Sequence, residues 1–219
     1  MTYKAIIFDM DGVLFDTEKF YYDRRKEFLD QKGISIIHLP PTFFIGGNMQ
    51  QVWQHILRDD YDKWNIDALQ KEYIDYKKKH PLPYRYLIFN DVRQTLHWAH
   101  TEGYKIGLAS SSSKYDILKA LSETHLTDYF DIILSGEEFP ETKPNPEIYN
   151  TAAKLLGVKK EECLIIEDSE KGISAAVNAQ IDVYAIKDIH FGIDQSKAKK
   201  TINNLTELVG QLTLNQYFY

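Results

Sequence analysis

The chain has 219 residues and a formal net charge of −6 at pH 7, and its length suggests one or two domains. Hydrophobic residues make up 43% and charged residues 26%, which excludes a disordered chain, a collagen-like repeat and a simple coiled coil. No long basic run accompanies the acidic excess. A general nucleic-acid binder is therefore not expected, because such proteins neutralise phosphates with Lys and Arg.

Cysteine content and hydropathy bear on the compartment. Cys163 has no partner for a disulfide, so a reducing compartment fits. No stretch approaches the roughly 20 apolar residues that span a bilayer, and the apolar run 5–8 is too short for a signal peptide. We predict a cytoplasmic monomer with neither a membrane nor a nucleic-acid partner.

The first predicted element is a buried strand at 4–9, which ends in Asp9. Asp11 follows two residues later and lies on the same face if the backbone is extended. Two carboxylates at the C-terminal edge of a sheet repel each other, and a bound Mg²⁺ would relieve that repulsion. A strand that ends in an Asp-Gly turn explains the same residues without a metal. For this segment taken alone, the turn is the preferred interpretation.

Residues 16 to about 80 show helical signals and no convincing strand. Ranges 20–29 and 69–78 look helical, and Gly33 would end the first of these helices. Five apolar residues recur at the spacing of one helix face, namely Met49, Val52, Trp53, Ile56 and Leu57. We predict a small all-helical cap domain at 16–83, inserted into a core formed by 1–15 and 84–219. Its expected place is over the carboxyl ends of the strands, where open α/β sheets bind ligands.

The remainder of the chain alternates strands and helices. Further strands are predicted at 105–110, 130–135, 163–167 and 183–187, and helices lie between them at 92–101, 115–124, 146–156 and 172–178. This alternation predicts an α/β fold, a doubly wound, Rossmann-like parallel sheet with helices on both faces.

Hydroxyl groups follow the second predicted strand. Ser110 ends the strand, and 111–113 lead into a helix. The free N–H groups at a helix start bind anions, and a serine hydroxyl can join them. We interpret 111–113 first as capping residues, with Ser113 and Asp116 resembling a capping box. Ser110 is the better candidate for binding phosphate, and Ser111 is a second candidate.

Two later segments add a cation and two acids. Pro144 and Pro146 flank a helix start and would hold Lys143 in place, where an unconstrained lysine would be solvated. Glu167 and Asp168 end another strand. This acid pair could complete a Mg²⁺ site or could cap the next helix.

Taken in order, these segments resemble the haloacid dehalogenase-like superfamily, in particular its branch of β-phosphoglucomutase and many small phosphatases. The matching segments are Phe8–Glu18, Lys143-Pro144-x-Pro146 and Glu167-Asp168-Ser169-x-x-Gly172. The resemblance covers the core at about 1–15 and 84–188 and the position of the helical cap. It implies the same fold and a phosphotransferase activity.

The resemblance also implies roles for individual residues. Asp9 would attack phosphorus and form an aspartyl-phosphate, and Asp11 would act as general acid–base. Ser110 and Lys143 would hold the phosphoryl oxygens.

The implied cofactor is Mg²⁺. Its ligands would be the Asp9 carboxylate, the Asp11 main-chain carbonyl and Asp168, and Glu167 would be a further ligand or would lie directly behind them. The seven histidines show no metal-ligand pair, so zinc is not expected.

The chain departs from the family pattern at the start of the predicted cap. Family members commonly carry a histidine about twelve residues after the nucleophile, where this chain has Tyr21. That substitution argues against mutase activity more than against hydrolysis. Thr17, Tyr21, Gly46 and Gly47 are candidate substrate contacts, although a helix break with Asn48 as N-cap explains the two glycines equally well.

Arg24 and Arg25 could meet an anionic substrate, but solvated helix positions are the preferred interpretation. Overall we predict a Mg²⁺-dependent phosphatase of a small phosphorylated metabolite, a sugar phosphate or similar phosphomonoester. A β-phosphoglucomutase-type mutase is the alternative. A non-catalytic phospho-ligand-binding or receiver-like protein is a more distant one, since receivers lack a helical insert after the first strand.

Overall fold

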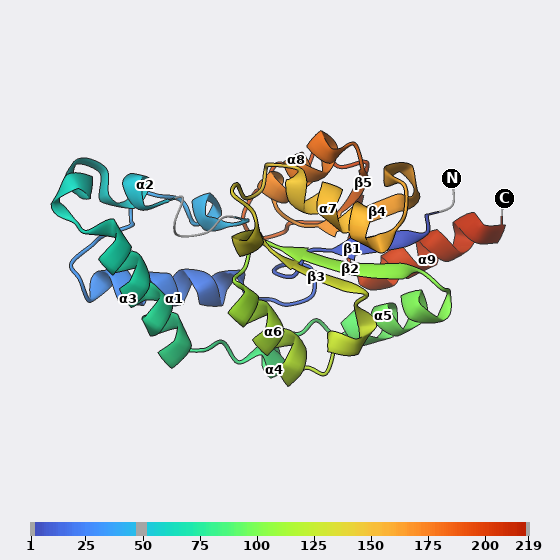
Figure 1. Ribbon diagram of the computed structural model, residues 1–219, viewed down its shortest axis with the longest axis horizontal. Helices are drawn as coiled ribbons and strands as arrows, with labels where there is room; N and C mark the ends of the chain where they lie inside the picture. The colour runs from blue at the N-terminus through green and yellow to red at the C-terminus, as the bar shows by residue number, and fades with distance from the viewer. Residues whose placement is uncertain (1–2, 47–51, 218–219) are drawn as a thin grey trace.

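The computed structural model describes residues 3–46 and 52–217. Its sheet is parallel throughout and has the strand order β3-β2-β1-β4-β5-β6 (Figure 1). The strands are β1 (Ala5–Phe8), β2 (Lys105–Ser110), β3 (Ile132–Ser135), β4 (Cys163–Glu167), β5 (Asp182–Ile186) and β6 (Lys200–Ile202). The chain leaves β1 in one direction along the sheet and returns to β1's other side at β4. This arrangement confirms the predicted doubly wound fold, whose ligand crevice lies at that reversal.

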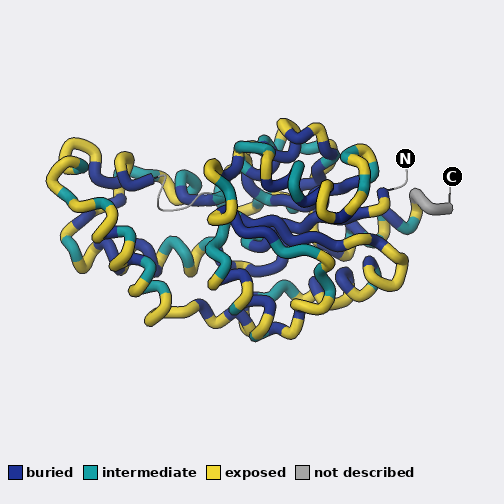
Figure 2. Tube along the Cα trace, viewed as in Figure 1, coloured by how far each residue is buried: buried dark blue, intermediate teal, exposed yellow. Residues whose placement is uncertain are grey.

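Helices cover both faces of the sheet and bury it completely at its centre (Figure 2). Ile6 and Phe8 belong to a core formed with α4 (Tyr84–Leu87), α5 (Val92–Thr101), α6 (Lys114–Glu123) and α9 (Leu205–Tyr217). Ala5 and Ile7 belong to the opposite core, formed with α7 (Glu147–Leu156) and α8 (Glu170–Ala179). Because side chains alternate along a strand, a strand buried on both faces is apolar at every position.

The insert after β1 is helical over its described residues and has a core of its own. Its elements are α1 (Glu18–Asp30), η1 (Pro41–Phe44), α2 (Trp53–Leu57), η3 (Arg58–Lys63) and α3 (Ile66–Lys79). Its buried apolar side chains, among them Phe28, Leu29, Trp53 and Tyr73, pack on one another. Figure 1 shows the insert beside the sheet rather than stacked on it. These observations agree with a helical cap, and the boundaries at 16 and 83 stay predictions.

Some elements differ from the sequence-based expectation. The predicted helical face at 49–57 becomes the short α2, and Met49 lies outside the described residues. The edge strand β6, helix α9 and the short 3₁₀ helices were not predicted; the latter include η4 (Thr127–Tyr129), η5 (Gly136–Glu138) and η6 (Lys160–Glu162). Within the parts of the chain that the structure describes, no helix has the length and apolar character needed to cross a bilayer.

Candidate active site

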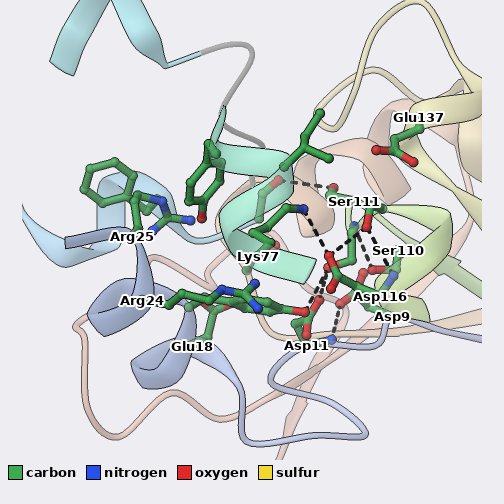
Figure 3. A pocket seen from close by; sticks show the side chains of 18 of the residues that line it. Asp9, Asp11, Glu18, Arg24, Arg25, Lys77, Ser110, Ser111, Asp116 and Glu137 are labelled. Carbon is green, nitrogen blue, oxygen red and sulfur yellow. Dashed lines mark hydrogen bonds and ion pairs between the residues drawn. The ribbon is translucent and has the colours of Figure 1, made fainter. Parts of the chain in front are cut away.

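The ends of the central strands converge on a cavity of about 120 Å³ between the sheet and the helical insert. Asp9 follows β1, Ser110 ends β2 and Asp168 follows β4, and all three line the cavity. Helices α1 and α3 of the insert supply the opposite wall (Figure 3). The topology therefore brings residues far apart in sequence to one place at the carboxyl edge of the sheet.

A buried lysine, Lys143, is held against Asp9, one of the residues that line the cavity. Its Nζ donates to Asp9 Oδ1 at 2.5 Å, to Glu167 Oε1 at 2.7 Å and to the carbonyl oxygen of Ala109 at 2.9 Å. Lys143 is only 2% exposed. Although burial alone would lower the pKa of Lys143, the carboxylates of Asp9 and Glu167 raise it well above its ordinary value. The expectation that this lysine is held in place, rather than solvated, is therefore confirmed.

Both carboxylate oxygens of Glu167 accept hydrogen bonds from neighbouring residues of the site. Oε1 accepts from Lys143 and from Tyr149 Oη at 2.8 Å, and Oε2 accepts from the amides of Asp168 and Ser169 at 3.0 and 3.1 Å. A Cβ on Gly172 would lie 1.6 Å from Oε1, so only glycine leaves room for this carboxylate. The N-cap of α8 is neither Glu167 nor Asp168. It is Ser169, whose side chain accepts from the amide of Gly172.

Asp9, Glu167 and Asp168 place carboxylate oxygens within 4.8 Å of one another. The Asp168 carboxylate lies against Gly12, whose φ of +76° and missing Cβ both suit this contact, since a Cβ would come within 2.0 Å of Oδ2. Burial, followed by the neighbouring Glu167, raises the pKa of Asp168 well above its ordinary value. The donor set is all oxygen, which is the set that Mg²⁺ prefers, and a divalent cation would offset the repulsion. The residues thus fit a magnesium ion.

Asp11 is oriented by two hydroxyl groups. Thr17 Oγ1 donates to Oδ1 at 2.5 Å and Ser112 Oγ donates to Oδ2 at 2.6 Å, while the Asp11 amide donates to Asp9 Oδ2 at 3.0 Å. Burial raises the pKa of Asp11, and the hydroxyls of Ser112 and Thr17 oppose that rise. A raised pKa favours the protonated form of the carboxyl group, which is the form that a general acid needs.

Tyr21 occupies the place where the family pattern has a histidine. Its Oη shares hydrogen bonds with Tyr84 Oη at 3.2 Å and with Ser112 Oγ at 3.4 Å, and Ser112 in turn donates to Asp11. Burial raises the pKa of Tyr21 well above its ordinary value. Sequence reasoning missed Ser112, because nothing in a run of four serines distinguishes the one that faces Asp11.

The serines on either side of Ser112 make different contacts. Ser110 Oγ accepts from the amide of Ser112 at 3.0 Å, and Ser111 Oγ donates to the carbonyl oxygen of Gly46 in the insert at 3.3 Å. Ser113 is the N-cap of α6 and accepts from the Asp116 amide, which confirms its capping role. Both Ser110 and Ser111 line the cavity, and their binding of phosphate stays a prediction.

The insert contributes one glycine, Gly46, and several cationic side chains to the cavity wall. Gly46 lines the cavity, whereas Gly47 and Asn48 lie outside the described residues. Arg24 and Arg25 are 6% and 7% exposed, so the preferred interpretation of solvated helix positions is wrong. They are buried because both lie on the part of α1 that lines the cavity between the insert and the core.

Further contacts of the insert were not expected from the sequence. Arg24 donates from Nη1 to the carbonyl oxygen of His80 at 3.1 Å, and the Arg25 guanidinium lies 4.5 Å from the centre of the Phe44 ring. Lys77 of α3 forms a 3.1 Å ion pair with Asp116 of α6 and joins insert to core.

Comparison with known proteins agrees with this architecture. Residues 6–186 match the family model described as haloacid dehalogenase-like hydrolase. The chain is 28% identical over 191 residues to a phosphorylated carbohydrates phosphatase of Thermotoga maritima, covering 84% of this chain and 85% of that protein. It is 27% identical over 177 residues to a phosphoglycolate phosphatase of Aquifex aeolicus, covering 80% and 81%.

Among solved structures, β-phosphoglucomutase from Clostridium difficile superposes with a TM-score of 0.83 at 24% identity, over 99% of each chain. At that identity the match shows a shared fold. Together with the family model, it confirms the expected fold and superfamily, so the chain belongs to the haloacid dehalogenase-like hydrolases.

Proposed function

We propose that this protein is a Mg²⁺-dependent phosphatase of small phosphomonoesters, acting through an aspartyl-phosphate on Asp9. The observation that carries the proposal is the position of Asp9 at the end of β1, bonded to a buried lysine and facing the cavity beside Asp11. The relatives whose names denote phosphatases of phosphorylated carbohydrates and of phosphoglycolate support the substrate class.

In the first half-reaction, an Asp9 carboxylate oxygen attacks phosphorus, and the bond to the leaving alkoxide oxygen breaks. Asp11, oriented by Thr17 and Ser112, gives its proton to that oxygen and releases an alcohol. In the second half-reaction, Asp11 takes a proton from water, whose oxygen attacks phosphorus and frees Asp9 and inorganic phosphate. One carboxyl group can serve both halves because its proton leaves in the first and returns in the second.

Positive charge is required because an anionic carboxylate attacks an anionic phosphate. Lys143 supplies one cation beside Asp9 and is locked by Glu167 and Ala109. Asp9, Asp168 and the Asp11 carbonyl would hold Mg²⁺, which when bound stabilises the charge of the transferring phosphoryl group. Ser110 and Ser111 are placed along the same wall to bind phosphoryl oxygens.

The proposal is tested by phosphate release from a panel of metabolite monoesters, assayed with Mg²⁺ and with EDTA. We expect turnover that EDTA abolishes and that Mg²⁺ restores. Asp168→Ala should raise the Mg²⁺ concentration needed for half-maximal rate, whereas Asp194→Ala, an exposed aspartate away from the cavity, should not. Full activity in EDTA would refute the metal assignment, and no phosphate release from any monoester would refute the phosphatase assignment.

A further inference from the structure

The two walls of the cavity differ in charge. The sheet side presents Asp9, Asp11 and Asp168, which belong to the catalytic and metal site proposed above. The insert side presents three cations, Arg24 and Arg25 on α1 and Lys77 on α3, and one acidic residue, Glu18 at the start of α1 (Figure 3). Lys143 pairs with Asp9, and Mg²⁺ would offset the charges of Asp9 and Asp168, so the cations of the insert are left to meet the rest of the substrate.

Arg24 is distinctive among these cations because part of its guanidinium has no hydrogen-bond partner. It is only 6% exposed, and Nη1 donates to the carbonyl oxygen of His80. Within residues 3–46 and 52–217, neither Nε nor Nη2 has a hydrogen-bond partner. Lys77 is paired with Asp116, and the Arg25 guanidinium packs on Phe44. A buried charged donor without a partner is costly, so such groups ordinarily face an acceptor.

The geometry of the guanidinium indicates which acceptor. Nε–H and Nη2–H lie on one edge of the planar group, and this edge forms two parallel hydrogen bonds with a carboxylate or a phosphate. Nη1, on the other edge, is held by His80, and the guanidinium lies 5.2 Å from the centre of the Tyr21 ring. These two contacts fix the plane of the group and leave its bidentate edge, buried and without a hydrogen-bond partner among the described residues, on a side chain that lines the cavity.

We infer that Arg24 binds a second anionic group of the substrate, so that the preferred phosphomonoesters carry a carboxylate or another phosphate in addition to the group that is transferred. This inference rests on the proposed function, because it assumes that the transferred phosphoryl group sits at Asp9. The alternative role for Arg24 is structural: it would only hold His80 and add positive charge near Asp116.

Substrates that differ in one group distinguish an anion-binding role of Arg24 from a structural one. We would compare kcat/KM for 2-phosphoglycolate and for 2-hydroxyethyl phosphate, which replaces the carboxylate with a neutral hydroxymethyl group. Ethylene glycol bisphosphate forms a third arm and distinguishes a phosphate-binding from a carboxylate-binding site. The wild type should prefer at least one of the two substrates that carry a second anionic group, over 2-hydroxyethyl phosphate, by about 10- to 100-fold, the range expected for one charge-assisted contact.

The variant Arg24→Gln should remove most of that preference, and Arg24→Lys, which keeps the charge but not the planar edge, should retain part of it. Arg58→Gln is the matched control, since Arg58 is an exposed arginine of the insert that does not line the cavity. A wild type without preference would overturn the inference. So would an equal fall for all three substrates in Arg24→Gln, because that is the signature of a structural role.

A binding measurement makes the test independent of turnover. Titration calorimetry with Mg²⁺ and the Asp9→Asn variant gives the affinities of the same compounds, with and without Arg24→Gln. If no monoester is hydrolysed but the affinity preference depends on Arg24, the proposed function fails and the second anion site stands. If Arg24→Gln leaves the affinity ratio unchanged, the inference is wrong whatever the enzyme hydrolyses.

Discussion

At the scale of single residues, the nucleophile assignment gives the sharpest prediction. Asp9→Asn keeps the size of the side chain and an oxygen that can accept from Lys143, but an amide is a poor nucleophile. We expect kcat to fall by more than about 100-fold, equivalent to about 2.7 kcal/mol, with little change in the unfolding temperature. Phosphate-release kinetics measure kcat, and a thermal melt measures the unfolding temperature. A variant that keeps more than about a hundredth of the wild-type kcat would remove Asp9 from this role.

Gly172 gives a second prediction at the same scale. In Gly172→Ala the new methyl group would overlap Glu167, which holds Lys143 and Tyr149. Forced overpacking typically costs about 1–3 kcal/mol, and we expect a loss of both stability and activity. Gly210→Ala is the control, because Gly210 lies in α9 with open space around its Cβ position. That change should stabilise by about 0.5–1 kcal/mol. Equal effects of the two substitutions in denaturant unfolding would contradict the packing argument.

At the scale of elements, the ion pair between Lys77 of α3 and Asp116 of α6 joins the insert to the core. The two side chains are 19% and 6% exposed, so solvent screens the pair only in part. A double-mutant cycle with Lys77→Met and Asp116→Asn should give a coupling of about 0.5–3 kcal/mol at pH 7. Denaturant unfolding measures it. Additive effects would mean that the pair contributes nothing to joining the elements.

The same pair predicts a pH dependence. Burial would raise the pKa of Asp116, but Lys77, Ser113 and Arg24 together hold it below its ordinary value. A lowered folded-state pKa stabilises the protein above the unfolded value, about 3.9 for aspartate, and that contribution is lost as pH falls through the folded pKa. The coupling should therefore be present at pH 7 and vanish in strong acid. A coupling that grew on acidification would contradict this assignment.

At the scale of the whole molecule, we expect closure of the insert over the cavity to decide between hydrolysis and isomerisation of a sugar phosphate. A mutase must keep water from the aspartyl-phosphate while a bisphosphate reorients, and lid closure is the general device for this. Tyr21, whose pKa is raised well above its ordinary value, cannot exchange protons near neutral pH as imidazole can. We therefore expect the rate of phosphate release to exceed the rate of isomerisation.

The measurement supplies β-glucose 1-phosphate with a trace of the 1,6-bisphosphate and follows glucose 6-phosphate together with inorganic phosphate. Many turnovers to glucose 6-phosphate per phosphate released would favour the mutase. If neither product forms while other monoesters are cleaved, the phosphatase proposal holds with a different substrate.

The sequence by itself predicted strands β1 to β5 and the chain order of the polar residues that follow them. Strands such as β1 and β4 are buried on both faces, so each is a short apolar run that needs no structural context to be recognised. Polar residues at the ends of these runs must meet, because the carboxyl ends of parallel strands share one edge. Asp9 and Asp168 could therefore be placed at one site from their positions in the chain.

The tertiary structure decided the contacts that depend on partners distant in sequence. Strand β6 has three residues and two exposed side chains, and its pairing with β5 defines it rather than any pattern of its own. Burial of Arg24 follows from how the insert lies against the core. The choice of Ser112 as the partner of Asp11 follows from how the loops after β1 and β2 lie against each other. Local periodicity encodes which face of an element is apolar. It does not encode which side chains of two packed elements come within hydrogen-bonding distance.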